Sequence, residues 1–203
     1  LPVRAPVSAL VPEKYWVEFE LPTRPSYPHI LDQDGYGACN GHAAISSLEW
    51  ARWLVGMSYI ALSPWYVYAI LCNGIDRGSS IEEALDLLCN KGTSPASAVP
   101  YGTINPAKIP PTAHDQAVRF RVQIGSPLKS FAELMSATQL RRPFNFSVCV
   151  GNNFNRLDSD GCPGVTRGAG NHAICGGLGA KKGKNGEWLI KFMNSWSTQW
   201  GID

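Results

Sequence analysis

The hydrophobic pattern of the chain changes character about halfway along it. In the first half, apolar residues recur at helical spacing and predict helices over 39–55, 64–72 and 81–90. Ser63 and Ser80 precede the second and third helices as N-caps. A fourth helix should follow Ser130, which forms a capping-box pattern with Glu133. The first half is therefore expected to be mainly helical.

The second half favours strands. Alternating or strongly apolar segments predict strands over 118–124, 144–150, 172–179 and 187–194. The last two flank a turn at 181–186 and are typical of a β-hairpin. A helical part, about 31–115, followed by a mainly β part, about 116–203, predicts one α+β domain over 1–203.

Residues 1–30 differ from the rest of the chain. Six prolines in this segment exclude a long helix. We expect an extended strap along the body of the protein, with a short autoinhibitory or binding role as the lesser alternative. Since the chain begins with Leu1 rather than Met, either a processed chain of a larger precursor or a piece cut from something longer is expected.

Composition is that of a globular domain, with 203 residues, 44% hydrophobic and 17% charged. The net charge of +2 comes without a dense basic stripe, which argues against nucleic acid as a partner. Lys181, Lys182 and Lys184 fit a solvated hairpin tip. No apolar run reaches the ~18 residues of a membrane span, so a soluble protein is expected.

Cys39 is the candidate with the most specific chemistry. It begins the first predicted helix, and Gly35 and Gly37 allow a sharp turn just before it. The partial positive charge at a helix N-terminus favours a thiolate, the form that attacks carbonyl carbon. This placement predicts a nucleophilic cysteine.

His172 is the predicted base for this thiol. His114 lies in a Pro-rich stretch expected to be an exposed loop, and His42, one turn after Cys39, is interpreted as a hydrogen-bonded interior histidine. The predicted hairpin would return Asn194 close to His172, where an amide oxygen can accept the imidazole N–H and fix its tautomer. Gln33 could join the Cys39 backbone N–H in an oxyanion hole.

These residues resemble those of the papain-like cysteine peptidases. That family has its His and Asn roughly 130 to 150 residues after the nucleophile, and here the offsets are 133 and 155. The segments Ser63-Pro64-Trp65-Tyr66 and Asn194-Ser195-Trp196 also resemble family elements. Asn40, Tyr36 and Ser197 depart from the pattern, which suggests a divergent microbial or viral type of member.

The resemblance implies a two-lobed papain-like fold, with a helical left lobe, a β-barrel-like right lobe and the active-site cleft between them. The implied activity is a cysteine endopeptidase acting through an acyl-enzyme. Gly78 and Ser79 would pair with the substrate backbone, and Gly170, Asn171 and neighbours of Tyr101 would line an apolar side-chain pocket. The resemblance also implies that Trp196 is a substrate-binding residue. In addition, its ring would shield the contact between His172 and Asn194 from water.

The implied partners are a peptide or protein substrate and a peptide-like inhibitor in the cleft, with no metal or organic cofactor. We expect a monomer. Two alternatives stay open: a peptidoglycan amidohydrolase or acyltransferase using the same Cys–His chemistry, and a non-catalytic papain-like binding protein. The Gly-rich loop 151–170 lacks the twelve-residue calcium pattern and is expected to be a flexible cleft rim.

Cysteine usage bears on the compartment. A catalytic Cys39 must stay reduced, which leaves five further cysteines, an odd number. The family's usual disulfide spacing is missing, so these are interpreted as buried free thiols. We therefore favour a reducing compartment.

Overall fold

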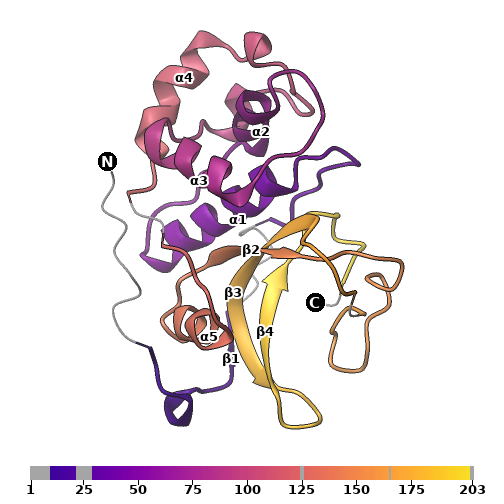
Figure 1. Cartoon of the computed structure of the whole chain (residues 1–203). Coiled ribbons are helices and arrows are strands. Elements are labelled where there is room, and N and C mark those ends of the chain that lie inside the picture. Colours follow the sequence, from indigo (N-terminus) through magenta and orange to yellow (C-terminus); the bar gives the residue numbers. More distant parts are fainter. Residues whose placement is uncertain (1–9, 22–28, 124–125, 165, 202–203) are drawn as a thin grey trace.

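The computed structural model describes residues 10–21, 29–123, 126–164 and 166–201. The helices are α1 (Cys39–Leu54), α2 (Pro64–Cys72), α3 (Ile81–Asn90), α4 (Pro111–Ala117) and α5 (Phe131–Gln139). The strands are β1 (Phe19–Glu20), β2 (Phe144–Val148), β3 (His172–Lys182) and β4 (Trp188–Met193). In Figure 1, α2, α3 and α4 gather on one side of α1, and the sheet with α5 lies on its other side.

The helices expected over 39–55, 64–72, 81–90 and after Ser130 are confirmed within one or two residues. Ser63 Oγ accepts a hydrogen bond from the Tyr66 N–H at 3.0 Å. Ser80 and Ser130 each form a complete capping box with the glutamate three residues later. These caps satisfy N–H groups that have no partner inside the helix, so local sequence indicates where α2, α3 and α5 begin.

The strand expected over 118–124 is wrong for the described residues. Val118–Phe120 is instead a 3-10 turn that continues α4, and residue 124 lies outside the described residues. Ala113, Ala117 and Phe120 are buried at helical spacing, a period that the alternation of the next few residues concealed. His114 is exposed as expected, but it lies on α4 rather than in a loop.

Strand β3 is the centre of the sheet. It pairs antiparallel with β1, β2 and β4, and the predicted hairpin is the β3–β4 pair. The register shifts between Gly176 and Gly179, which marks a bulge in β3. These four described strands form an open sheet, so the barrel-like closure implied by the resemblance is not observed among the described residues.

Helix α1 packs on both halves of the molecule. Ala44 and Ile45 belong to the larger apolar core, which α1 shares with α2, α3 and α4. Trp50, 1% exposed, packs with Cys175 and Leu178 of β3 in a second cluster. Because both faces of α1 are covered, its N-terminal residue Cys39 is held at the boundary between the helices and the sheet.

The described part of the N-terminal segment, residues 10–21, runs along α5 and the sheet (Figure 1). Val11 N–H donates to Ser136 Oγ at 2.9 Å, and the Trp16 ring contacts Phe131 and Trp188 edge-on. The short strand β1, which the sequence did not predict, pairs with β3. This stretch is part of the packed body.

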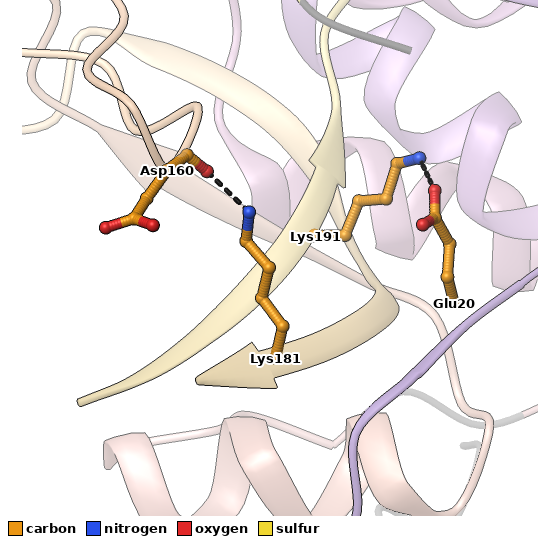
Figure 2. Close-up of polar contacts among 4 residues, drawn as sticks. All are labelled: Glu20, Asp160, Lys181 and Lys191. Atoms are coloured by element: carbon orange, nitrogen blue, oxygen red, sulfur yellow. Dashed lines mark hydrogen bonds and ion pairs between the residues drawn. The ribbon is translucent and has the colours of Figure 1, made fainter. Parts of the chain in front are cut away.

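Side chains on the sheet surface join β1 and β4 across β3. Glu20 and Lys191 are both paired in register with Gly179, and their side chains form an ion pair over it, which Figure 2 shows. A Cβ atom on Gly179 would lie 2.9 Å from the Phe19 carbonyl oxygen. Glycine at this position therefore allows the close approach of the two neighbouring strands.

All six cysteines are free, as expected, although only Cys72 and Cys175 are fully buried. Burial raises the pKa of the Cys175 thiol to about 12. Among the helices of the described segments, none is long and apolar enough to cross a bilayer.

Candidate active site

Cys39 is the first residue of α1 and is partly exposed to a cavity of about 690 Å³. Its loop turns through Asp34 and Gly35, which both have positive φ, at 45° and 75°. The N–H groups of a first helical turn have no intrahelical acceptor and carry the positive end of the helix dipole. The sulfur thus lies at the positive end of the helix dipole.

Residues from distant parts of the chain line this cavity. One side, here called the helix wall, consists of Gln33, Gly37, Cys39, Asn40 and residues 76–82. The other, the sheet wall, consists of Ser147 and residues 170–173. The structure therefore brings Cys39, His172, Gln33, Gly78, Ser79, Gly170 and Asn171 to one cavity.

His172 is held at the start of β3, where it pairs in register with Val148 of β2. Its side chain is buried, and Nε2 lies 2.7 Å from Asn194 Oδ1. Burial lowers the pKa of His172, and the hydrogen bond to Asn194 opposes this effect. An uncharged imidazole whose Nε2–H is bound to Asn194 leaves Nδ1 as the basic nitrogen.

Gln33 and Asn194 are connected through Ser195. The Gln33 backbone N–H donates to the Ser195 carbonyl at 3.0 Å, and Ser195 Oγ donates to Gln33 Oε1 at 2.7 Å. Gln33 Nε2 donates to the Tyr36 carbonyl at 2.6 Å, which uses one of its two hydrogens. The same short segment therefore fixes the proposed orienting amide and the proposed oxyanion donor.

Trp196, expected among the substrate-binding residues, is not among the residues that line the cavity. Its ring instead packs on His172, with centroids 4.8 Å apart, and contacts Phe154 and Trp200 edge-on. This aromatic cover lies over the imidazole, in line with the predicted shielding role, and contact of Trp196 with substrate stays a prediction.

The backbone of the helix wall is partly occupied by internal hydrogen bonds. The Gly78 N–H donates to Tyr68 Oη at 3.2 Å, and Asn40 Nδ2 donates to the Ser79 carbonyl. Among the described residues, the Gly78 carbonyl and the Ser79 N–H have no such partner. Of the backbone groups of Gly78 and Ser79, only these two are therefore free to pair with a substrate backbone.

The sheet wall is shaped by Gly170 and Asn171. A Cβ atom on Gly170 would lie 1.8 Å from Ser147 Oγ, so the wall admits only glycine there without rearrangement. The Asn171 side chain makes two hydrogen bonds to the Val150 backbone, at 2.7 and 3.0 Å. Asn171 thus closes the base of the loop 151–170, and its amide is not directed at a ligand.

The apolar side-chain pocket expected from the resemblance stays a prediction. The cavity lining contains Ile81 and Ala173 as its aliphatic residues, and the others are glycine, polar or charged, including Asp76, Arg77 and Glu82. Tyr101 and its neighbours are absent from the lining. A preference for an apolar substrate side chain therefore has no support in this cavity.

Two further predictions concern His42 and the loop 151–170, which lie outside the catalytic set. His42 is buried, its Nδ1 lies 2.9 Å from the Ala38 carbonyl, and burial lowers its pKa to about 4, which confirms an interior histidine. The flexible rim expected over 151–170 stays a prediction; within this loop, the Asp160 carbonyl accepts a hydrogen bond from Lys181 at 2.7 Å (Figure 2). The described residues hold no cluster of ligands suited to a metal ion.

Sequence reasoning missed the residues that connect the helix wall to the Cys39 loop. Asp76 Oδ1 accepts the Gly37 N–H at 2.9 Å and the Tyr68 hydroxyl, although 39 residues separate Gly37 from Asp76. The sequence carried no sign of this pairing apart from the unusual density of glycine around the nucleophile. Asn40 was noted only as a departure from the family pattern.

Comparisons with known proteins agree with this geometry. No family model and no curated protein sequence matches the chain. Xylellain, a cysteine protease from Xylella fastidiosa, is similar in structure, with 19% identity over 95% of this chain and 77% of that one and a TM-score of 0.70. The bromelain protease from Ananas comosus, in complex with the E64 inhibitor, has 24% identity over 86% and 80% of the two chains and a TM-score of 0.61.

Digestive procathepsin L 3 of Tenebrio molitor larval midgut is also similar, with 15% identity over 98% of this chain and 66% of that one and a TM-score of 0.69. Identities this low establish a shared fold and not a shared activity. The chain therefore has the papain-like α+β fold of these cysteine proteases.

Proposed function

We propose that this protein is a cysteine endopeptidase in which Cys39 is the nucleophile and His172 the base. The observation that carries the proposal is the buried His172–Asn194 hydrogen bond on one wall of a cavity whose other wall holds Cys39 at a helix N-terminus. A base oriented by a third group, across from an activated thiol, is the arrangement that thiol-based acyl transfer needs.

In this mechanism His172 Nδ1 takes the proton of the Cys39 thiol and becomes an imidazolium, and Cys39 Sγ attacks the scissile carbonyl carbon to form a tetrahedral intermediate. The Cys39 N–H and the second hydrogen of Gln33 Nε2 stabilise the oxyanion. The imidazolium of His172 then gives its proton to the leaving amine, which yields the acyl-enzyme. His172 next activates a water molecule, whose attack releases the acid product and restores the thiol.

The substrate is proposed to be an extended peptide lying between a helical lobe and a β lobe. The Gly78 carbonyl and the Ser79 N–H are the free backbone groups that could pair with it as a strand does. The charged and polar lining supports substrates with polar side chains near the scissile bond. We propose that the protein is a monomer. We also propose a reducing compartment, and the six free cysteines support this second proposal.

The test is labelling by E-64, the epoxide compound present in the bromelain structure. Intact mass spectrometry should show one adduct on the wild type, and Cys39→Ser should abolish it. Cys162→Ser is the matched control, because burial raises the pKa of that partly exposed thiol and it lies outside the cavity lining. A folded wild-type protein that stays unlabelled would refute the peptidase assignment and favour a non-catalytic binding protein.

Casein and peptidoglycan digestion separate the remaining chemistry. Cleavage of casein supports an endopeptidase, since the open cavity admits an extended chain. Digestion of cell walls without casein would point instead to an amidohydrolase that uses the same Cys–His pair. Both assays need the Cys39→Ser variant as the blank.

A further inference from the structure

A hydrogen-bonded cluster joins the loop before Cys39 to the helix wall of the cavity. Asp76 accepts hydrogen bonds from the Gly37 N–H and from the Tyr68 hydroxyl, and Tyr68 Oη accepts one from the Gly78 N–H. Asn40, directly after the nucleophile, reaches the same wall through the Ser79 carbonyl. Gly37, two residues before Cys39, and Asn40, directly after it, are therefore both hydrogen-bonded to the segment 76–79.

The cluster is packed so closely that only glycine fits at residue 37. A Cβ atom there would lie 2.9 Å from Gly78 N, 2.9 Å from Tyr68 Oη and 3.0 Å from Asp76 Oδ1. Real Cβ atoms rarely approach backbone or fixed polar atoms this closely, so the loop and the wall are in direct contact. Three separate segments of the chain converge at this point.

Tyr68 gives the cluster a rigid support. It lies on α2 and is fully buried in the core that α1 and α2 share. Burial, with the hydrogen bond to Asp76, raises the pKa of the phenol, so it keeps the proton that it donates to Asp76. By contrast, the loop itself is exposed at Asp34 and Gly35.

No disulfide reinforces this connection, since all six cysteines are free. The Gly37 N–H is two residues before Cys39, whose own N–H is the proposed oxyanion donor. Gly78 and Ser79 carry the proposed edge for the substrate backbone. A shift of the loop against the wall would therefore change the distance between the two places where a peptide must bind at once.

We propose that Asp76 and Tyr68 are positioning residues that fix the Cys39 loop against the substrate-binding edge of the cleft. This inference rests on the proposed peptidase function. Asp76 acts as an acceptor of two hydrogen bonds, and its negative charge is not required. Loss of the cluster lowers kcat, because the oxyanion donors move, and raises KM, because the Gly78–Ser79 edge moves.

The experiment compares Asp76→Ala with Asp76→Asn and Tyr68→Phe, with Asp115→Ala on α4 as a control outside the cavity. Asp76→Ala should lower kcat/KM for peptide cleavage by about 10- to 100-fold, as expected for a small displacement of reacting groups. Asp76→Asn keeps the acceptor oxygen and should stay within about threefold of the wild type. Tyr68→Phe, which leaves Asp76 in place, should fall between them.

Amide hydrogen exchange of the peptide covering residues 34–40 provides a readout that does not depend on activity. Exchange should be faster in Asp76→Ala and Tyr68→Phe and unchanged in Asp76→Asn and Asp115→Ala. If Asp76→Ala does not fold, the Tyr68→Phe variant alone tests the positioning role. This variant removes only one buried hydroxyl group.

The outcomes separate this inference from the proposed function. A wild type that neither cleaves peptides nor reacts with E-64 removes the peptidase assignment and with it the catalytic role of the cluster. An active wild type whose Asp76→Ala and Tyr68→Phe variants match it in kcat, KM and exchange overturns this inference alone. Equal losses in Asp76→Asn and Asp76→Ala would also overturn it, since charge would then be the cause.

Discussion

The two walls of the cavity are built in different ways. On the sheet wall, His172 is held by the ladder between β2 and β3, and Asn194 directly follows β4, whose last residue pairs with Cys175. On the helix wall, the segment 76–79 is held by hydrogen bonds to the side chains of Asn40 and Tyr68. A backbone ladder tolerates side-chain changes, whereas single side-chain contacts do not.

The largest effect should come from removing chemistry on the sheet wall while its ladder stays intact. His172→Gln should reduce kcat by about 10⁴-fold, because the base is lost. Gln can still hydrogen-bond to Asn194, so the unfolding midpoint should change little. Steady-state kinetics and thermal unfolding measure the two effects, and His114→Gln on α4 is the control. A His172→Gln variant that retains activity would remove His172 from the mechanism.

The same contrast explains what the sequence could predict. The hairpin over β3 and β4 and the capping boxes at Ser80 and Ser130 depend on neighbours within a few residues, so their patterns are visible locally. The placement of His172 and Asn194 followed from that hairpin. Asp76 and Gly37 meet only through tertiary packing, and no local pattern records that contact.

The strand expected over 118–124 failed for a physical reason as well. The segment 118–120 alternates in polarity, yet Phe120 is buried with Ala113 and Ala117 as one helical face. The expected apolar pocket came from resemblance, whereas residues 76–82 place Asp76, Arg77 and Glu82 at the cavity. Side chains in such loops vary while the backbone fold stays, so resemblance carries the fold further than it carries the lining of a pocket.

A second prediction concerns α1, which supports the helix wall. Glu49 is buried, and its Oε1 accepts the Leu62 N–H at 2.7 Å. Burial raises its pKa from 4.5 to about 7, so the folded state favours the protonated form. Stability from this group is fully present below pH 4.5 and is lost as pH rises through 7. Each pH unit in this interval is worth about 1.4 kcal/mol.

Glu49→Gln should remove this dependence. The difference in unfolding free energy between the variant and the wild type should grow by roughly 3 kcal/mol between pH 4 and pH 8, measured by urea denaturation. Taking the difference matters because His42 acts with the opposite sign. Its pKa is lowered to about 4, so its contribution is present above pH 6.5 and lost on acidification. A difference that does not change with pH contradicts the prediction.

A third prediction tests whether a substitution in the loop before β3 destabilises the sheet wall while the backbone pairing of β2 and β3 stays in place. Gly170→Ala places a Cβ atom 1.8 Å from Ser147 Oγ and 2.7 Å from Ser147 Cβ, so the loop must shift. We expect a loss of about 2 kcal/mol in unfolding free energy and reduced kcat/KM, because residue 170 is two residues before His172. Combining it with Ser147→Gly removes both clashing atoms and should recover part of each loss, because glycine within β2 itself weakens the strand. Failure of this rescue would mean that the clash is not the cause.

The smallest effect should come from the ion pair between Glu20 and Lys191 on the sheet surface (Figure 2), since neither residue lines the cavity. The two side chains are 60% and 31% exposed, so water and salt screen their attraction. Lys191→Met should therefore change the unfolding free energy by less than about 1 kcal/mol, and the change should shrink further in 1 M salt.

Gly179→Ala, at the residue that both side chains face, is the sharper comparison, since its Cβ atom would meet the Phe19 carbonyl and Lys191 Cβ. If the charge variant proved more harmful than the glycine variant, side chains and not the backbone ladder would hold the sheet wall together.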